Sequence, residues 1–225
     1  MSKYLVELKK SFRLSANPAN SVGMKAYMLH QFDFYGIKTP ERDKIVKSYI
    51  SANPLHTIKE LNGIIATMWA FKEREWQYAA IDVYKHHRIL WQENAIDLIE
   101  SCLISKSWWD TVDGIGSDWI PAYFSKYPNQ IAPVTNRWNQ SDNIWLQRSS
   151  ILFQRSFKTR TDKALLKKYI LFHKDAKDFF VQKAIGWALR EYGKTNPEWV
   201  IDFVAKNKIA PLSKREAMKR IISKK

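Results

Sequence analysis

Apolar residues recur every three to four positions along nearly the whole chain, which is the spacing of an amphipathic α-helix. The pattern is clear over residues 4–12, 79–91 and 184–192. Convincing runs of two-residue alternation, which would predict β-strands, are absent from the sequence. Most of the eight prolines lie between the periodic segments. The pattern therefore predicts an all-α protein with helices of about 10–16 residues and short connections.

A second periodicity repeats the helices themselves. Four blocks spaced by 35 residues begin at Trp76, Thr111, Leu146 and Val181. Glutamine is the second residue of three blocks, and the fourth residue is always small. The residues that precede the blocks and could begin their helices are Glu73, Ser107, Asn143 and Asp178. This period predicts an α-solenoid of stacked HEAT-like helix pairs, which we expect to form a single domain over residues 1–225.

The third residue of each block defines one stripe along such a solenoid. The stripe consists of Tyr78, Asp113, Arg148 and Lys183. Residues four apart share a helix face, so Trp109 lies beside Asp113, and Trp187 lies beside Lys183 with Arg190. A basic concave face with Arg, Lys and Trp is typical of a surface for a nucleic-acid backbone. The alternative is a solvated helix face, which would accept interchangeable polar residues.

The charge of the chain supports a polyanionic partner. Lys and Arg number 37 against 22 Asp and Glu, giving a net charge of +15. This excess favours nucleic acid first and a membrane surface second, and the chain lacks a separate basic amphipathic segment for a membrane. The single cysteine, Cys102, excludes an internal disulfide framework. With no signal peptide or spanning segment in the pattern, we expect a cytoplasmic protein.

Several common kinds of site are not indicated by the sequence. The five histidines lack the spacing of metal ligands, and no CxxC, HExxH or GxxxxGK motif occurs. We therefore expect no metal and no cofactor. The segment GIGSDW at 114–119 lacks the third glycine of a dinucleotide loop, and we expect its glycines to serve close helix packing.

Asp113 is the residue of the stripe that a pure DNA-binding protein would not need, because a carboxylate repels phosphates. It makes chemical sense if a cation must be held against the DNA, or if positive charge develops during a reaction. The breaking of a glycosidic bond toward an oxocarbenium-like sugar is such a reaction.

Long segments of the chain resemble the AlkD-type DNA alkylation repair glycosylases. They are KAYMLHQFDFYGIKTPER at 25–42, KSWWDTVD at 106–113, SDNIWLQRSSILFQ at 141–154, QKAIGWALREYGKTNP at 182–197 and APLSKREAMK at 210–219. The resemblance covers nearly the whole chain, and it includes the 35-residue period. Departures from the family pattern lie in DGIGSDW after Val112 and in RSFKTRTD at 155–162.

The resemblance implies a monofunctional DNA glycosylase that removes cationic N3- and N7-alkylated purines from double-stranded DNA and leaves an abasic site. It implies that Asp113 is catalytic and that Trp109 and Trp187 flank the sugar of the damaged nucleotide. It further implies that Arg148 holds the DNA backbone and that Tyr27 lies near the DNA. The family works without a closed base-flipping pocket, and we expect this chain to act as a monomer.

On this hypothesis Asp113 would stabilise the developing sugar cation and orient water, and the tryptophans would exclude solvent. Arg148 would bind a phosphate bidentately. The residues expected to make further phosphate contacts are Lys183, Arg190, Lys214 and Arg215. The last two lie in PLSKRE, which could present a helix N-terminus to phosphate.

Each of these assignments has a structural alternative. Trp109 and Trp187 could be core residues, although Trp108 could take the core position beside Trp109. Asp113 could be the structural partner of Arg148 one repeat away, and Tyr27 could be one of several packing aromatics. The alternative function is a non-catalytic α-solenoid that binds distorted or branched DNA by shape and charge.

Overall fold

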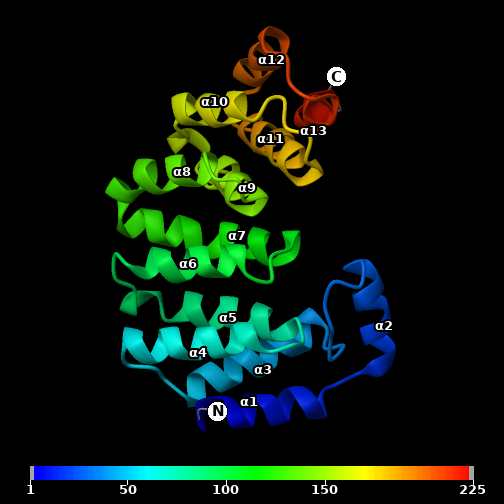
Figure 1. The fold of residues 1–225 in the computed structure, drawn as a ribbon, viewed down its shortest axis with the longest axis vertical. Helices are drawn as coiled ribbons and strands as arrows, with labels where there is room; N and C mark the ends of the chain where they lie inside the picture. Colours follow the sequence, from blue (N-terminus) through cyan, green and yellow to red (C-terminus); the bar gives the residue numbers. More distant parts are fainter. Residues whose placement is uncertain (1–2, 223–225) are drawn as a thin grey trace. The chain divides into compact units, whose positions relative to one another are not determined.

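The computed structural model describes residues 3–222, which are helical through most of their length (Figure 1). No β-strand occurs in this range. Its β-type backbone pairing is limited to one isolated bridge, between Asp33 and Glu73. The all-α class and the stacked helices predicted from the sequence are confirmed. The chain divides into two compact units, which meet at Leu98–Ile99 inside helix α6 (Ala95–Ile104). The single domain expected over residues 1–225 stays a prediction.

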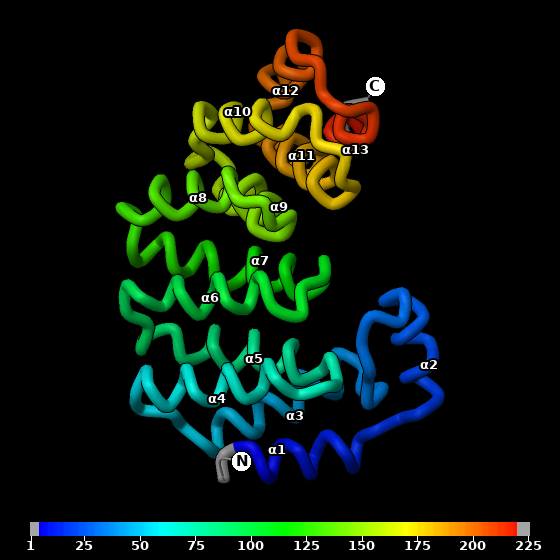
Figure 2. Tube along the Cα trace, viewed as in Figure 1, coloured from blue at the N-terminus to red at the C-terminus, as the bar shows by residue number. Residues whose placement is uncertain are grey.

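The first unit is built on a row of alternate helices. Its helices are α1 (Lys3–Leu14), α2 (Pro18–Tyr27), α3 (Thr39–Ala52), α4 (Ile58–Ala70), α5 (Glu75–His86) and the short η1 (Arg88–Leu90). Helix α3 packs against both α1 and α5, and α4 pairs with α5. Figure 2 shows α2 and the loop after it lying to one side of α3, α4 and α5.

A buried carboxylate fixes the loop that follows α2. Glu75 accepts hydrogen bonds from the backbone N–H groups of Tyr35, Gly36 and Ile37, at 3.1, 2.8 and 3.1 Å. Burial raises the pKa of Glu75, and these hydrogen bonds oppose the increase. Gly36 has φ +90°, and a side chain there would run into the backbone of Asn17. The loop is therefore tied both to α5 and to the start of α2.

The second unit continues the alternation of helices. It contains α7 (Trp109–Lys126), η2 (Pro128–Gln130), α8 (Ile131–Asn139), α9 (Ile144–Leu152), η3 (Lys158–Arg160), α10 (Lys163–Phe172), α11 (Phe179–Tyr192), α12 (Pro197–Lys206) and α13 (Pro211–Ile222). Helix α9 packs against α7 and α11, and α11 packs against α13. The odd-numbered helices thus form a row, and α8, α10 and α12 lie between them in sequence (Figure 1).

The recurring glutamine makes the same hydrogen bond in the three blocks that contain it. The side-chain amides of Gln77, Gln147 and Gln182 each donate to the backbone carbonyl six residues earlier. These carbonyls belong to the connection that precedes each helix, where backbone groups need partners. The repeated spacing in the sequence therefore reflects one bond, which ties α5, α9 and α11 each to the turn before it.

The predicted helix starts are partly confirmed. Asn143 and Asp178 are N-caps, and each side chain accepts hydrogen bonds from two backbone N–H groups. The predictions for Glu73 and Ser107 are wrong. Helix α5 begins after Arg74, and the Ser107 hydroxyl donates instead to the carbonyl of Leu103, at 2.6 Å. The side chain of Ser107 therefore bonds back to the last turn of α6 and does not cap α7.

Close helix packing depends on a different glycine from those expected. A Cβ at Gly116 would meet nothing within 4 Å, so the prediction for the glycines of GIGSDW is wrong at this position. A Cβ at Gly186 would run into the side chain of Glu216 and lie 2.8 Å from the carbonyl of Ser213. Gly186 therefore allows α11 and α13 to approach each other closely.

Most tryptophans belong to the core. Those expected to pack inside and found buried are Trp69, Trp76, Trp91, Trp119, Trp138 and Trp145, whereas Trp199 is half-buried and stacks on Phe203. No helix of the described part is long and apolar enough to cross a membrane.

Candidate active site

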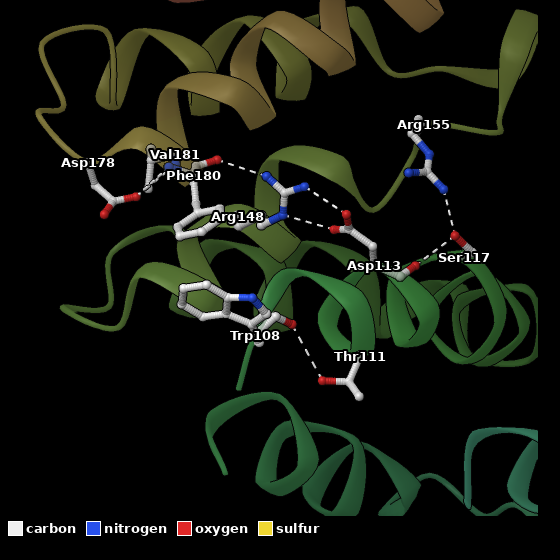
Figure 3. A network of polar contacts seen from close by, with 9 residues as sticks. All are labelled: Trp108, Thr111, Asp113, Ser117, Arg148, Arg155, Asp178, Phe180 and Val181. Carbon is white, nitrogen blue, oxygen red and sulfur yellow. Dashed lines mark hydrogen bonds and ion pairs between the residues drawn. The ribbon is translucent and has the colours of Figure 1, made fainter. Parts of the chain in front are cut away.

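The residues of the predicted stripe in the second unit meet directly. Arg148 on α9 donates from Nε and Nη2 to the two carboxylate oxygens of Asp113 on α7, both at 2.9 Å (Figure 3). The side chains are 5% and 18% exposed. A bidentate pair of this kind fixes both the position and the plane of the carboxylate. The alternative in which Asp113 is the structural partner of Arg148 is therefore realised in the structure.

The same guanidinium reaches a third helix. Nη1 of Arg148 donates to the carbonyl oxygen of Phe180, in the first turn of α11, at 2.8 Å. Asp178 caps this turn (Figure 3). Arg148 thus joins α7, α9 and α11, and it is oriented by the protein itself. Three of its five N–H donors have protein partners. Its expected bond to a phosphate stays a prediction.

An aromatic cluster supports the ion pair. Trp108, which precedes α7, packs against Trp145 at 5.9 Å and against Phe180 at 5.2 Å between ring centroids. Trp145 and Phe180 are themselves 4.9 Å apart. Trp108 therefore takes the packing position, as the sequence suggested. Its neighbour Trp109 is half-buried at the start of α7, one turn before Asp113.

Trp187 meets an arginine that the sequence did not single out. The guanidinium of Arg155 lies 4.0 Å from the centroid of the Trp187 ring, and that of Arg148 lies 5.8 Å away. Arg155 also donates to the hydroxyl of Ser117 at 2.6 Å, and this hydroxyl donates to the carbonyl of Asp113 at 2.7 Å (Figure 3). The surroundings of Asp113 therefore contain two arginines, whose positive charges offset the negative charge of the carboxylate.

The basic residues predicted farther along α11 share a carboxylate. Lys183 and Arg190 approach the carboxylate oxygens of Glu216 on α13, at 3.2 and 2.7 Å, and Lys219 approaches one of them at 2.6 Å. Burial alone raises the pKa of Glu216, but the bonds from Lys219 and Lys183 outweigh it and bring the pKa to about 2. With three cations and one anion, the cluster carries a net positive charge. Its contact with phosphate stays a prediction.

The remaining predicted residues lie near the ends of helices. Lys214 and Arg215 are exposed in the first turns of α13, which has no acidic residue in its first turn. Tyr27 is the last residue of α2 in the first unit, and it is 69% exposed. It borders a groove of about 370 Å³ that is also lined by Arg42 and Tyr78. The roles of Tyr27, Lys214 and Arg215 in DNA binding stay predictions.

Two features limit other chemistries. Among residues 3–222 there is no group of three or more His, Cys, Asp or Glu side chains that could hold a metal ion. The thiol of Cys102 is 2% exposed, and burial raises its pKa far above the ordinary value. A protonated, buried thiol is a poor nucleophile.

Comparison with known proteins shows the family of the chain. The profile of the family described as DNA alkylation repair enzyme matches residues 8–221, so the chain belongs to that family. A solved structure described as a predicted DNA alkylation repair enzyme from Enterococcus faecalis is 32% identical, with a TM-score of 0.86. The match covers 91% of this chain and 96% of that one. No curated protein matches the chain.

Proposed function

We propose that the protein is a monofunctional DNA glycosylase that hydrolyses the N-glycosidic bond of cationic N3- and N7-alkylated purines in double-stranded DNA. Membership of the DNA alkylation repair family supports the substrate class. The observation that carries the proposal is the Asp113 carboxylate, which is oriented by Arg148, partly exposed, and close to Arg155 stacked on Trp187.

The proposed reaction needs little from the enzyme. An alkylated purine carries a positive charge, so it leaves with the electron pair of the glycosidic bond and becomes neutral. The deoxyribose gains positive charge at C1′, to which the oxygen of a water molecule then bonds. The water loses a proton, and the products are the free base and an abasic site. The protein therefore has to stabilise a sugar cation and position one water.

Asp113 can serve both purposes. Each carboxylate oxygen accepts one hydrogen bond from Arg148 and keeps a second lone-pair site for a water. We expect Trp109 and Trp187 to limit the access of solvent to the carboxylate, which would strengthen its interaction with the sugar. Burial of the pair also orients the carboxylate before the substrate arrives.

Direct transfer of the alkyl group to a cysteine is disfavoured, because the chain has one cysteine and its thiol is buried. Hydrolysis of the glycosidic bond avoids the need for such an acceptor. Because the family resemblance implies no closed pocket, we also propose that purines with adducts larger than methyl are released. Failure to release any bulky N7 adduct would contradict this part of the proposal.

A second function is favoured by one observation. Both oxygens of Asp113 are already bonded to Arg148, as they would be in a purely structural pair. In that case the chain would be a non-catalytic solenoid that recognises distorted or branched DNA by shape and charge.

Product analysis separates the two functions. A duplex with one 7-methylguanine is incubated with an excess of protein, and the free base and alkali-sensitive abasic strands are measured together. The proposal predicts equal amounts of 7-methylguanine and abasic sites, above the protein-free rate. Restored guanine in the intact strand would indicate dealkylation, and tight binding without either product would support the non-catalytic function.

A further inference from the structure

Arg155 was not predicted from the sequence, and it differs from the predicted basic residues Arg148, Lys183 and Arg190 in having no carboxylate partner among residues 3–222. Arg148 is paired with Asp113, and Lys183 and Arg190 are paired with Glu216. Arg155 is half-buried, yet no carboxylate of the described residues lies within 4.0 Å of its guanidinium. It is therefore a partly desolvated cation beside Asp113 that has no anion bonded to it within the described part of the chain.

The position of Arg155 is set by the protein. It lies in the turn that extends α9, where its backbone N–H donates to the carbonyl of Leu152 at 2.9 Å. The guanidinium lies against the ring of Trp187, and Ser117 accepts one of its hydrogen bonds at 2.6 Å. Stacking on an aromatic ring leaves the N–H groups at the edge of a guanidinium directed outward in its plane.

The charges around Arg155 favour an anion. Asp113 and Arg148 together are neutral, so Arg155 adds a net positive charge to the site. Burial lowers the pKa of Arg155, while the nearby carboxylates of Asp113 and Glu191 oppose this change and Arg148 adds to it. A guanidinium remains charged even so, and its planar donors match two oxygens of a phosphodiester.

We propose that Arg155 binds a backbone phosphate of the DNA strand that carries the damaged nucleotide, through the N–H groups that face away from Trp187 and Ser117. The inference rests on the proposed function, because it requires DNA at Asp113. The phosphate would accept hydrogen bonds from the remaining N–H groups of Arg155. This contact would hold the sugar of the damaged nucleotide between Trp187 and Asp113. Arg155 is thus a DNA-binding residue, and it acts on the reaction only by positioning the strand.

The test is the salt dependence of DNA binding, measured by fluorescence anisotropy with a labelled duplex over a range of NaCl concentrations. Each phosphate contact to B-DNA contributes about 0.9 to the slope of log K against log salt. Arg155→Gln is therefore expected to reduce the slope by about 0.9, and to weaken binding roughly tenfold near 0.1 M salt. Arg155→Lys should keep the slope but lose part of the affinity, because an ammonium group cannot bond in two places.

Lys167→Gln is the matched control. Lys167 is exposed on α10, so this variant removes one positive charge from a helix that carries none of the site residues. Its slope should equal that of the wild type. Thermal unfolding of each variant verifies that the protein is folded under the binding conditions. A wild-type slope in Arg155→Gln, or an equal loss in Lys167→Gln, would overturn the proposal for Arg155.

The same samples separate this inference from the proposed function. Base release from a 7-methylguanine duplex is measured alongside, with protein in excess. If the wild type releases the base but the slope is unchanged in Arg155→Gln, the glycosylase stands and the phosphate contact falls. If the slope falls but no base is released, the phosphate contact stands without the glycosylase. A wild type that does not bind DNA overturns both.

Discussion

Replacement of Asp113 by asparagine tests how strongly the central ion pair holds the second unit together. The variant keeps one oxygen that can accept from Arg148, but it removes the negative charge and the second acceptor. Arg148 is 5% exposed, so its charge would remain inside the protein with only the amide oxygen and the carbonyl of Phe180 as partners. The perturbation therefore leaves an uncompensated buried cation between α7, α9 and α11.

The expected cost follows from this burial. Removal of one partner of a buried ion pair typically lowers the free energy of unfolding by about 3–5 kcal/mol. Since asparagine keeps one hydrogen bond, we expect a loss near 3 kcal/mol, or roughly 6–12 °C in the unfolding midpoint for a chain of this size. Asp202→Asn provides the contrast, because Asp202 and Lys206 form a pair whose side chains are 57% and 72% exposed. Exposed pairs contribute at most about 1 kcal/mol.

The assay is urea-induced unfolding at neutral pH, followed by circular dichroism and by tryptophan fluorescence on the wild type and both variants. The predicted order of stability is wild type, then Asp202→Asn, then Asp113→Asn well below. If Asp113→Asn unfolds at the same urea concentration as Asp202→Asn, the Asp113–Arg148 pair does not stabilise the packing of these helices, and the reasoning from burial is refuted.

Three further predictions concern packing and pH. Gly186→Ala should destabilise the protein by roughly 1–3 kcal/mol in urea unfolding, because its Cβ would run into α13. Gly116→Ala should be neutral or stabilising, because the space around its Cβ is free. Equal effects of the two substitutions would contradict the close packing of α11 and α13. Burial lowers the pKa of His87 below 6.5, so its stabilising contribution is complete above pH 6.5 and declines as the pH falls below it, and His87→Asn should flatten that part of the stability profile. Glu216 has a folded pKa of about 2 against an ordinary 4.5, so it stabilises the fold above pH 4.5 and loses this effect as the pH falls toward 2. Glu216→Gln should therefore lower stability at pH 7 by about 3 kcal/mol and remove the slope between pH 4.5 and 2; an unchanged slope would contradict its ion pairs.

The fold was predictable because its signals are local and repeated. The helical spacing gave the class, and the 35-residue period gave the helix pairs, since three of the four blocks carry the same glutamine bond to the preceding turn. Helix starts were less predictable. Asn143 and Asp178 cap their helices, but Ser107 bonds backward to Leu103, a choice that depends on the geometry of the connection.

The candidate site was predictable where its residues follow the period. Asp113 and Arg148 are 35 residues apart and meet because successive blocks lie side by side. Arg155 falls outside the aligned positions and follows the last residue of α9, so its stacking on Trp187 depends on how the turn after α9 is shaped. The only sequence signal for it is the spacing of seven residues from Arg148, which is two helical turns. Glu216 was missed because its three cations come from two different helices.

The measurement that tests the central claim most directly is single-turnover release of 7-methylguanine by the wild type and by Asp113→Asn, with DNA binding measured on the same samples. The temperature is set well below the unfolding midpoints of both proteins, so that the loss of stability does not affect the comparison. The account predicts release by the wild type and a rate about 10²–10³-fold lower for the variant, with binding retained. Equal rates in the two proteins, or no release by a wild type that binds the duplex, would contradict it.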